Sequence, residues 1–244
     1  MKKMFMAVIA LMMTISASAQ FYIYCSDGNV IKVDSISMVS PAQGNTNQEN
    51  GYEYVDLGLS VKWATCNVGA SKPEEYGDYF AWGETQPKYY YDWSTYKWCR
   101  GSYDTQTKYC TSSSYGSVDN KTQLELSDDA ARANWGGSWR MPTDAELTEL
   151  CEQCTWTWTT QNGVYGYKVT SMKSGYTNKS IFLPAAGYRN DSSLYSAGSF
   201  GLYWSSSLYS YDPDRAYGLG FYSGIVAWNS YDRNCGHSVR PVCQ

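Results

Sequence analysis

The chain has 244 residues, a formal net charge of −4, and an aromatic content of 16% that includes 24 tyrosines and 10 tryptophans. An acidic chain without a basic run does not fit a nucleic-acid-binding protein, whose affinity rests on Lys and Arg contacts to phosphates. We therefore expect no nucleic-acid partner. We also expect aromatic side chains to supply much of the hydrophobic core.

The first residues have the features of an export signal. Lys2 and Lys3 precede an apolar run over residues 5–15, and Ala17-Ser18-Ala19 matches the small-residue cleavage pattern. The apolar run is too short to span a bilayer, and the bulky residues before Cys25 do not suit a lipid-bearing cysteine. We predict a signal peptide at 1–19, no membrane insertion, and export to the periplasm, the cell surface or the medium.

The segment after the signal predicts a small β-hairpin and a linker. Two β-rich runs within residues 20–40 flank the sequence SDGN, which is favourable hairpin-turn chemistry. Residues 41–51, PAQGNTNQENG, have no hydrophobic pattern and are interpreted as a linker. The main domain is then expected at 52–244.

The first part of this domain predicts little regular structure. EYVDLGLSVKWATCNVG indicates two short strands around Gly58, and residues 71–125 are loop-rich with many Trp and Tyr residues. We expect this stretch to be held by its aromatic side chains and by a disulfide between Cys99 and Cys110.

Two helices are predicted next. The first has Ser127 as its N-cap and stops at Gly136, and the second begins with a capping box formed by Thr143 and Glu146. Every later segment is β-like. Helices followed by strands in one domain predict an α+β fold with two helices and a mostly antiparallel β region.

The C-terminal third has the composition of a recognition surface. It has no glutamate after Glu152 and no lysine after Lys179, and it is rich in Tyr, Ser, Gly, Asp and Asn. Antibody paratopes share this composition, because Tyr offers stiff contact area while Ser, Gly and Asn adapt their hydrogen bonds. The alternative is a Tyr-rich β region with ordinary polar loops. We predict that these residues cluster on one exposed surface: Tyr209, Tyr211, Asp212, Asp214, Arg215, Tyr217, Tyr222, Asn229, Tyr231, Asp232, Asn234 and His237.

Strand alternation supports that prediction. In RAYGLGFYSG, Leu219 and Phe221 are expected to face the core, which places Tyr222 in solvent. Gly218 and Gly220 would then leave a shallow floor between larger neighbours. In the next strand we expect Trp228 to be buried, so that Ala227 and Asn229 are exposed.

Several motifs resemble a known bacterial family. EYVDLGLSVKWATCNVGA, GDYFAWGET, WGGSWRMPTDAEL, IFLPAAGYR, GLYWSSS and GHSVRPV together resemble the Fibrobacter succinogenes major paralogous domain, which is common in exported proteins of Bacteroidetes. The resemblance covers about residues 52–244. It implies a C-type-lectin-like fold related to the formylglycine-generating-enzyme group.

The resemblance adds a hypothesis about sequence variation. Some members of this lectin-like superfamily are diversified by retroelements that randomise adenines in the codons of a C-terminal variable region. The polar residues of the tail are among those that changes at such adenines can produce. A fixed framework would be formed by Trp204, Leu219, Phe221, Trp228, Val239 and Pro241.

Other kinds of chemistry fit the sequence less well. Cys235 and Cys243 lie where a cysteine-dependent oxidase would need a reactive pair, but their surroundings, DRNCGHSVRPVCQ, do not match that active site. The CEQC motif at Cys151 lacks the further ligands that zinc requires. Asp212 and Asp214 supply too few oxygens for calcium. We predict no cofactor and no metal.

The predicted function is ligand binding by an exported, non-enzymatic protein, with a protein or a glycan at a cell surface as the partner. Trp204 and Trp228 are candidates for stacking on sugars, with core packing as the alternative. A glycan-processing or cysteine-dependent enzyme and a structural module of a surface assembly are the competing functional hypotheses.

Overall fold

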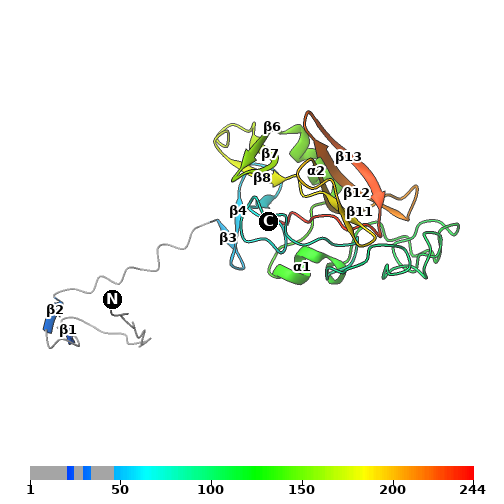
Figure 1. The fold of residues 1–244 in the computed structure, drawn as a ribbon, viewed down its shortest axis with the longest axis horizontal. Coiled ribbons are helices and arrows are strands. Elements are labelled where there is room, and N and C mark those ends of the chain that lie inside the picture. Colours follow the sequence, from blue (N-terminus) through cyan, green and yellow to red (C-terminus); the bar gives the residue numbers. More distant parts are fainter. Residues whose placement is uncertain (1–20, 25–29, 34–46) are drawn as a thin grey trace. The chain divides into compact units, whose positions relative to one another are not determined.

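The computed structural model describes residues 21–24, 30–33 and 47–244. The chain divides into two units, Met1–Asn45 and Thr46–Gln244 (Figure 1). In the first unit, β1 (Phe21–Tyr24) pairs antiparallel with β2 (Val30–Val33), where the hairpin was predicted. The predicted signal peptide and the first part of the predicted linker lie outside the described residues.

One sheet joins the start of the second unit to its C-terminal end. Its strands lie in the order β14-β5-β4-β3. Because β3 falls within residues 41–51, the predicted boundary at residue 52 is too late: this part of the predicted linker is a strand of the domain. The four strands are β3 (Gln48–Glu49), β4 (Tyr52–Val55), β5 (Lys62–Ala64) and β14 (Val242–Cys243).

A second sheet follows the helices. Its Thr- and aromatic-rich strands are typical β sequences, and the first two are joined by Asn162 and Gly163 with φ values of 48° and 83°. Positive φ at both positions is what a two-residue hairpin turn requires. The strands, in the antiparallel order β6-β7-β8, are β6 (Cys154–Gln161), β7 (Val164–Ser171) and β8 (Ser180–Pro184).

The C-terminal sheet carries six of the twelve predicted recognition residues. It is antiparallel, in the order β11-β12-β13, and it follows a short hairpin of β9 and β10 (Figure 1). The bounds are β9 (Tyr188–Asn190), β10 (Ser193–Tyr195), β11 (Phe200–Leu208), β12 (Arg215–Tyr222) and β13 (Ile225–Asp232).

Helices are few and short. After a 3₁₀ turn at Leu126–Asp128, α1 (Ala130–Trp135) is capped by the Asp129 side chain, which accepts a hydrogen bond from Arg132 N. The predicted N-cap, Ser127, is therefore wrong. α2 (Asp144–Glu152) begins at Thr143 with the predicted capping box.

The predicted α+β class with two helices is wrong. Strands and isolated bridges make up 38% of the described residues and helical residues 9%, and α2 is the one described helix of seven residues or more. The fold is mostly β, built from several small sheets. The expectation failed because α1 has only six residues. No observation supports the lectin-like fold that the resemblance implies.

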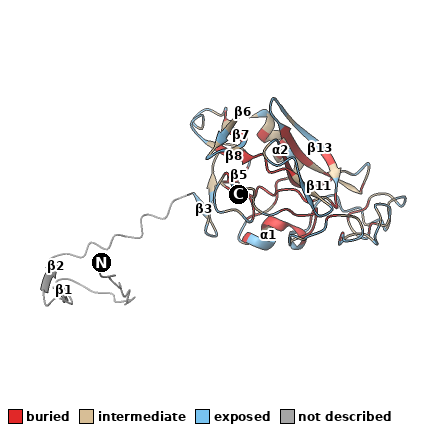
Figure 2. Cartoon of the chain, in the orientation of Figure 1, coloured by how far each residue is buried: buried red, intermediate tan, exposed pale blue. Residues whose placement is uncertain are grey.

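The C-terminal sheet lies between two hydrophobic clusters, so β11 is buried along almost its whole length (Figure 2). One face carries Tyr203, Leu219 and Phe221, which pack with Leu147 and Leu150 of α2. The other face contributes Trp204, Leu208 and Ala216 to a second cluster. This cluster also contains four buried tryptophan or tyrosine residues from residues 82–139.

The segment after β13 passes through the interior. It forms bridges to Phe80, Arg189 and Tyr203, and it buries Arg233 and Arg240 completely. Neither guanidinium has a carboxylate partner among the described residues; both donate to backbone carbonyls and to one side-chain oxygen each. The segment is therefore fixed by hydrogen bonds to distant parts of the chain.

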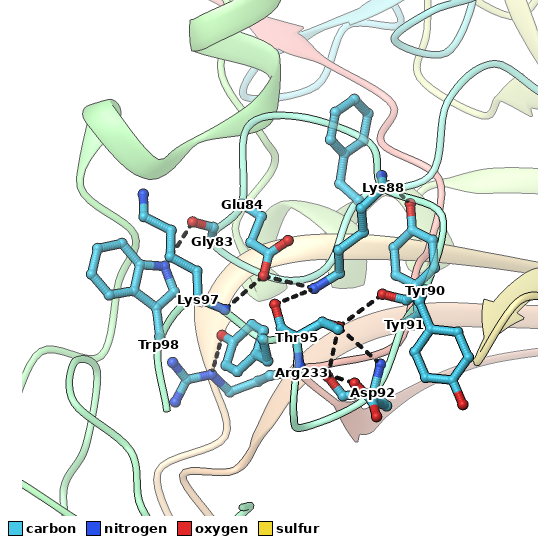
Figure 3. Close-up of polar contacts among 12 residues, drawn as sticks. Gly83, Glu84, Lys88, Tyr90, Tyr91, Asp92, Thr95, Lys97, Trp98 and Arg233 are labelled. Carbon is cyan, nitrogen blue, oxygen red and sulfur yellow. Dashed lines mark hydrogen bonds and ion pairs between the residues drawn. The ribbon is translucent and has the colours of Figure 1, made fainter. Parts of the chain in front are cut away.

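Aromatic and polar contacts hold the long loop region, as predicted. Arg233 Nε donates to the Tyr96 hydroxyl at 2.8 Å, and the Arg233 guanidinium lies over the rings of Trp82 and Tyr96. Figure 3 shows the neighbouring contacts of Glu84, whose carboxylate accepts hydrogen bonds from Lys88 Nζ at 2.9 Å and Lys97 N at 2.8 Å.

The predicted disulfide between Cys99 and Cys110 is wrong, since both thiols are free. Cys99 Sγ donates to Trp93 O at 3.0 Å, and Cys110 Sγ donates to Ser112 O at 3.1 Å. The loop between them instead forms a bridge from Cys99 to Gln106.

Candidate binding surfaces on the C-terminal sheet

The register of the C-terminal sheet separates the predicted recognition residues onto two faces. Tyr217 is paired with Ser230 on one face, and Ala216 is paired with Tyr231 on the other. Paired residues of an antiparallel ladder point to the same side. The twelve residues therefore do not form one cluster, and the prediction of a single surface is corrected.

One face carries a row of four aromatic side chains, here called the aromatic ridge: Tyr209, Tyr211, Tyr217 and Trp228. The ring centroids of Tyr209 lie 5.6 Å from Tyr211 and 5.3 Å from Tyr217, and those of Tyr217 and Trp228 lie 6.2 Å apart. Tyr211 is 79% exposed and Trp228 56% exposed, so the row opens to solvent at both ends.

Trp228 corrects a second prediction, since it was expected in the core. It is opposite Leu219 in the ladder, on the core side of the sheet. However, β13 is an edge strand, and the α2 cluster that covers Leu219 and Phe221 does not include Trp228. Its ring contacts Tyr217 instead. Ala227 and Asn229 are also exposed.

The turn that carries two of the ridge tyrosines is tightly held. Tyr209 N donates to Arg215 O at 3.1 Å, and Arg215 N donates to Asp212 O at 2.9 Å. From outside the turn, the Tyr115 hydroxyl donates to Asp212 Oδ1 at 3.0 Å, and Thr111 Oγ1 donates to Ser210 O at 2.7 Å. These contacts fix the position of the ridge before any ligand arrives.

The carboxylates of this turn do not form a metal centre. No group of three His, Cys, Asp or Glu residues within the described ranges is placed to hold an ion. Asp212 is bonded to Tyr115, and burial raises the pKa of Asp214, with Asp232 and Asp212 adding to the effect.

The other face contains a hollow of about 260 Å³. Its apolar walls come from β9, β11 and β13. Arg215 and Asp232 also line it as an ion pair, with Nε and Oδ1 3.5 Å apart; they are the last pair of the β12–β13 ladder and, by alternation, belong to the side of Tyr217, so the hollow extends around this end of the sheet. The remaining lining residues, here called the walls and base of the hollow, are Tyr188, Phe200, Leu202, Tyr231, Cys235 and His237.

Tyr231 lies directly over the predicted glycine floor. A Cβ on Gly220 would be 2.1 Å from the Tyr231 hydroxyl oxygen, and one on Gly218 would be 3.2 Å from the Tyr231 ring. The two glycines thus make room for this ring against the sheet. The floor exists, but a tyrosine of the neighbouring strand covers it.

His237, predicted to be exposed, is 1% exposed. Its imidazole stacks on Trp204 with centroids 3.9 Å apart and meets the edge of Tyr231 at 5.2 Å. Burial lowers the pKa of His237 to about 3, so the imidazole is neutral at physiological pH. Asn234 is buried as well, because both residues belong to the segment that passes through the interior.

The other predicted residues divide by exposure. Tyr222 and Asp232 are exposed as expected. Leu219 and Phe221 are fully buried, as the alternation indicated. Three other walls of the hollow, Tyr188, Phe200 and Leu202, were not predicted; the alternation along β11 was the signal that places Phe200 and Leu202 on one face.

The cysteines near the C-terminus are protonated thiols at neutral pH. Burial raises the pKa of Cys235 to about 12 and that of Cys243 to about 11. A nucleophilic cysteine needs a lowered pKa. No observation therefore favours the cysteine-dependent oxidase.

Comparison with known proteins gives a family match to the C-terminal part of the chain. A family model described as "Domain of unknown function (DUF8237)" matches residues 172–242, which include the C-terminal sheet, the aromatic ridge and the hollow. No curated protein and no solved structure matches the chain. Among the described residues, no helix is both long and apolar enough to cross a membrane.

Proposed function

We propose that this chain is an exported binding protein that recognises a protein partner through the aromatic ridge. The observation that carries the proposal is the continuous row of four aromatic rings on one exposed face, whose three ring contacts have centroid distances of 5.3–6.2 Å. Tyr and Trp are the residues that most often dominate the binding energy of protein interfaces. Export is proposed from the leader sequence.

The geometry of the ridge favours a protein over a glycan. Adjacent rings are inclined to one another by 54°, 86° and 63°, so they do not form a flat platform on which successive sugar rings would stack. Rings that are inclined to one another present both faces and edges, which suits contacts with the varied side chains of a protein. The fixed turn lowers the ordering cost of binding.

The resemblance to the Fibrobacter succinogenes major paralogous domain is retained as a proposal on its sequence motifs, without the lectin-like fold. Diversification of the tail by a retroelement is likewise a proposal. Variation confined to ridge positions in closely related genes, with Trp204 and Leu219 unchanged, would support it.

The binding proposal is tested by substituting residues of the ridge and, as a control, an equally exposed tyrosine outside it. Tyr211 is 79% exposed on the ridge, and Tyr89 is 78% exposed elsewhere. Partners captured from surface extracts by the purified chain are compared by surface plasmon resonance with Tyr211→Ala, Trp228→Ala and Tyr89→Ala. We expect the ridge variants to weaken binding at least about fivefold, since hot-spot truncations cost more than about 1 kcal/mol. Tyr89→Ala should bind as the unmodified chain does.

Two outcomes would contradict the proposal. Equal losses in all three variants would place the binding elsewhere. Binding to a glycan array that depends on Trp228, without a protein partner, would replace the protein by a glycan as the ligand of the ridge.

A further inference from the structure

The hollow on the opposite face contains polar atoms that the protein itself does not use. In native proteins, buried polar groups are almost always hydrogen-bonded. Here, the buried polar atoms without a hydrogen-bond partner in the described part of the chain include His237 Nδ1, and His237 lines the hollow. Arg215 Nε also lacks a hydrogen bond, but it is held in the ion pair with Asp232. Asp214 Oδ1, Asn234 Oδ1 and Ser238 Oγ, from the same stretch of chain, also lack partners.

The Tyr231 hydroxyl adds a second group without a protein partner to this site. It makes no hydrogen bond to any described residue, although the ring is fixed between the glycine floor and the His237 imidazole. The side chain is half-buried, so its hydroxyl can be reached by a ligand in the hollow. A hydroxyl held in place without a partner is preorganised to bind a ligand.

The charge of the site points to a neutral ligand. The Arg215 guanidinium is compensated by the Asp232 carboxylate at 3.5 Å, and Arg215 Nη2 donates to Ser230 O at 2.7 Å. His237 is uncharged at neutral pH. An anionic ligand would be attracted by Arg215 but repelled by Asp232, and a cationic ligand would be repelled by Arg215 but attracted by Asp232. Neither would gain a net attraction from the ion pair.

The walls point to a ligand with an apolar face. Tyr188, Phe200, Leu202 and Tyr231 provide aromatic and aliphatic surface around the polar base. A volume of about 260 Å³ is slightly below the range typical of drug-sized ligands, so it suits a single ring. A neutral sugar combines an apolar ring face with hydroxyls that donate and accept hydrogen bonds.

We propose that the hollow between β9, β11 and β13 binds one neutral monosaccharide unit, with the Tyr231 hydroxyl and the His237 imidazole as its hydrogen-bonding groups. The site lies on the face opposite the aromatic ridge and does not depend on the partner of the ridge. A terminal sugar of a glycan or a free sugar supplies the same chemistry, and the measurement below uses both.

The chain offers a specific reporter, because His237 is its only histidine. The imidazole signals are followed by NMR while the purified chain is titrated with neutral hexoses, N-acetylhexosamines, their methyl glycosides and short glycans. Glucuronic acid and glucosamine serve as charged sugars, and cyclohexanol as an apolar ring with one hydroxyl. We expect saturable shifts of the His237 signals with at least one neutral sugar, and weaker or no shifts with the charged sugars and cyclohexanol.

The substitution Tyr231→Phe removes only the hydroxyl, and Tyr222→Phe is its matched control on the exposed end of the same sheet. We expect Tyr231→Phe to weaken sugar binding roughly three- to tenfold, as the loss of one hydrogen bond predicts, without a loss of thermal stability. Tyr222→Phe should bind as the unmodified chain does.

The proposal is overturned if no neutral sugar shifts the His237 signals, or if Tyr231→Phe binds the sugar as tightly as Tyr222→Phe does. Sugar binding that leaves the His237 signals unchanged and is lost in Trp228→Ala would also overturn it, and would assign the sugar to the ridge. If Trp228→Ala no longer binds the protein partner of the ridge but its His237 signals still shift normally with the sugar, the two sites are independent.

Discussion

At the scale of single residues, His237 shows how burial sets a charge state. Its imidazole is packed between Trp204 and Tyr231, and burial disfavours the protonated form. The pKa is lowered to about 3 from the ordinary value of 6.5. The unfolded chain therefore binds a proton at pH values where the folded chain does not.

This difference predicts a pH dependence of stability. The contribution of neutral His237 is fully present above pH 6.5 and declines as the pH falls from 6.5 towards 3, since protonation then favours the unfolded state. Between pH 7 and pH 5 the free energy of unfolding should fall by about 2 kcal/mol from this residue. Urea unfolding at both pH values measures it.

The control is His237→Phe, which keeps a ring on Trp204 and removes the titrating group. Its stability should fall less between pH 7 and pH 5 than that of the unmodified chain. An equal fall in the two proteins would assign the pH dependence to other groups.

At the scale of elements, α2 shows what local sequence can predict. Thr143 Oγ1 accepts a hydrogen bond from Glu146 N at 3.2 Å, and Thr143 N donates to Glu146 Oε2 at 2.8 Å. Arg140 then binds the same carboxylate through two nitrogens. The cap was predictable because its two partners are three residues apart in the sequence. The hydrogen bonds from Arg140 to the Glu146 carboxylate were not predicted.

The capping box yields a stability prediction for this helix. Thr143→Ala leaves the N–H of Glu146 without its partner, and it should lower the free energy of unfolding by about 1 kcal/mol. Thr148→Ala is the matched control, because Thr148 Oγ1 donates back to Asp144 O within the same helix and alanine is the better helix former.

Denaturant unfolding of both variants measures the difference. Thr148→Ala should be neutral or slightly stabilising. If Thr143→Ala is as stable as Thr148→Ala, the cap contributes nothing, and the packing of Leu147 and Leu150 alone keeps the helix folded.

At the scale of the whole molecule, the sequence predicted strands better than surfaces. Alternation correctly placed Leu219 and Phe221 in the core, because strand period is local. Alternation failed for Trp228, because the local sequence does not show how far α2 extends over the sheet. It also failed for His237 and Asn234, because bridges to Phe80 and Arg189 across long sequence separations draw their segment inside. The fold class failed because the first predicted helix forms only the six residues of α1.

The domain begins before residue 52, because Glu49 contacts its interior. Trp139 is completely buried, and its Nε1 donates to Glu49 O at 2.7 Å, while Ser138 N donates to Glu49 Oε1 at 2.8 Å. Glu49 lies in β3, before the boundary that the sequence predicted. A chain of residues 52–244 would lose both hydrogen bonds, each of which contributes about 0.5–1.5 kcal/mol.

Three purified chains test this boundary by chemical denaturation: 20–244, 46–244 and 52–244. We expect the first two to unfold at the same denaturant concentration, because residues 46–244 form one compact unit. The third should be less stable by at least about 2 kcal/mol, since it loses the Glu49 contacts and the β3–β4 pairing. Equal stability of 46–244 and 52–244 would contradict a structural role for β3. A loss already present in 46–244 would instead show that residues 20–45 stabilise the domain.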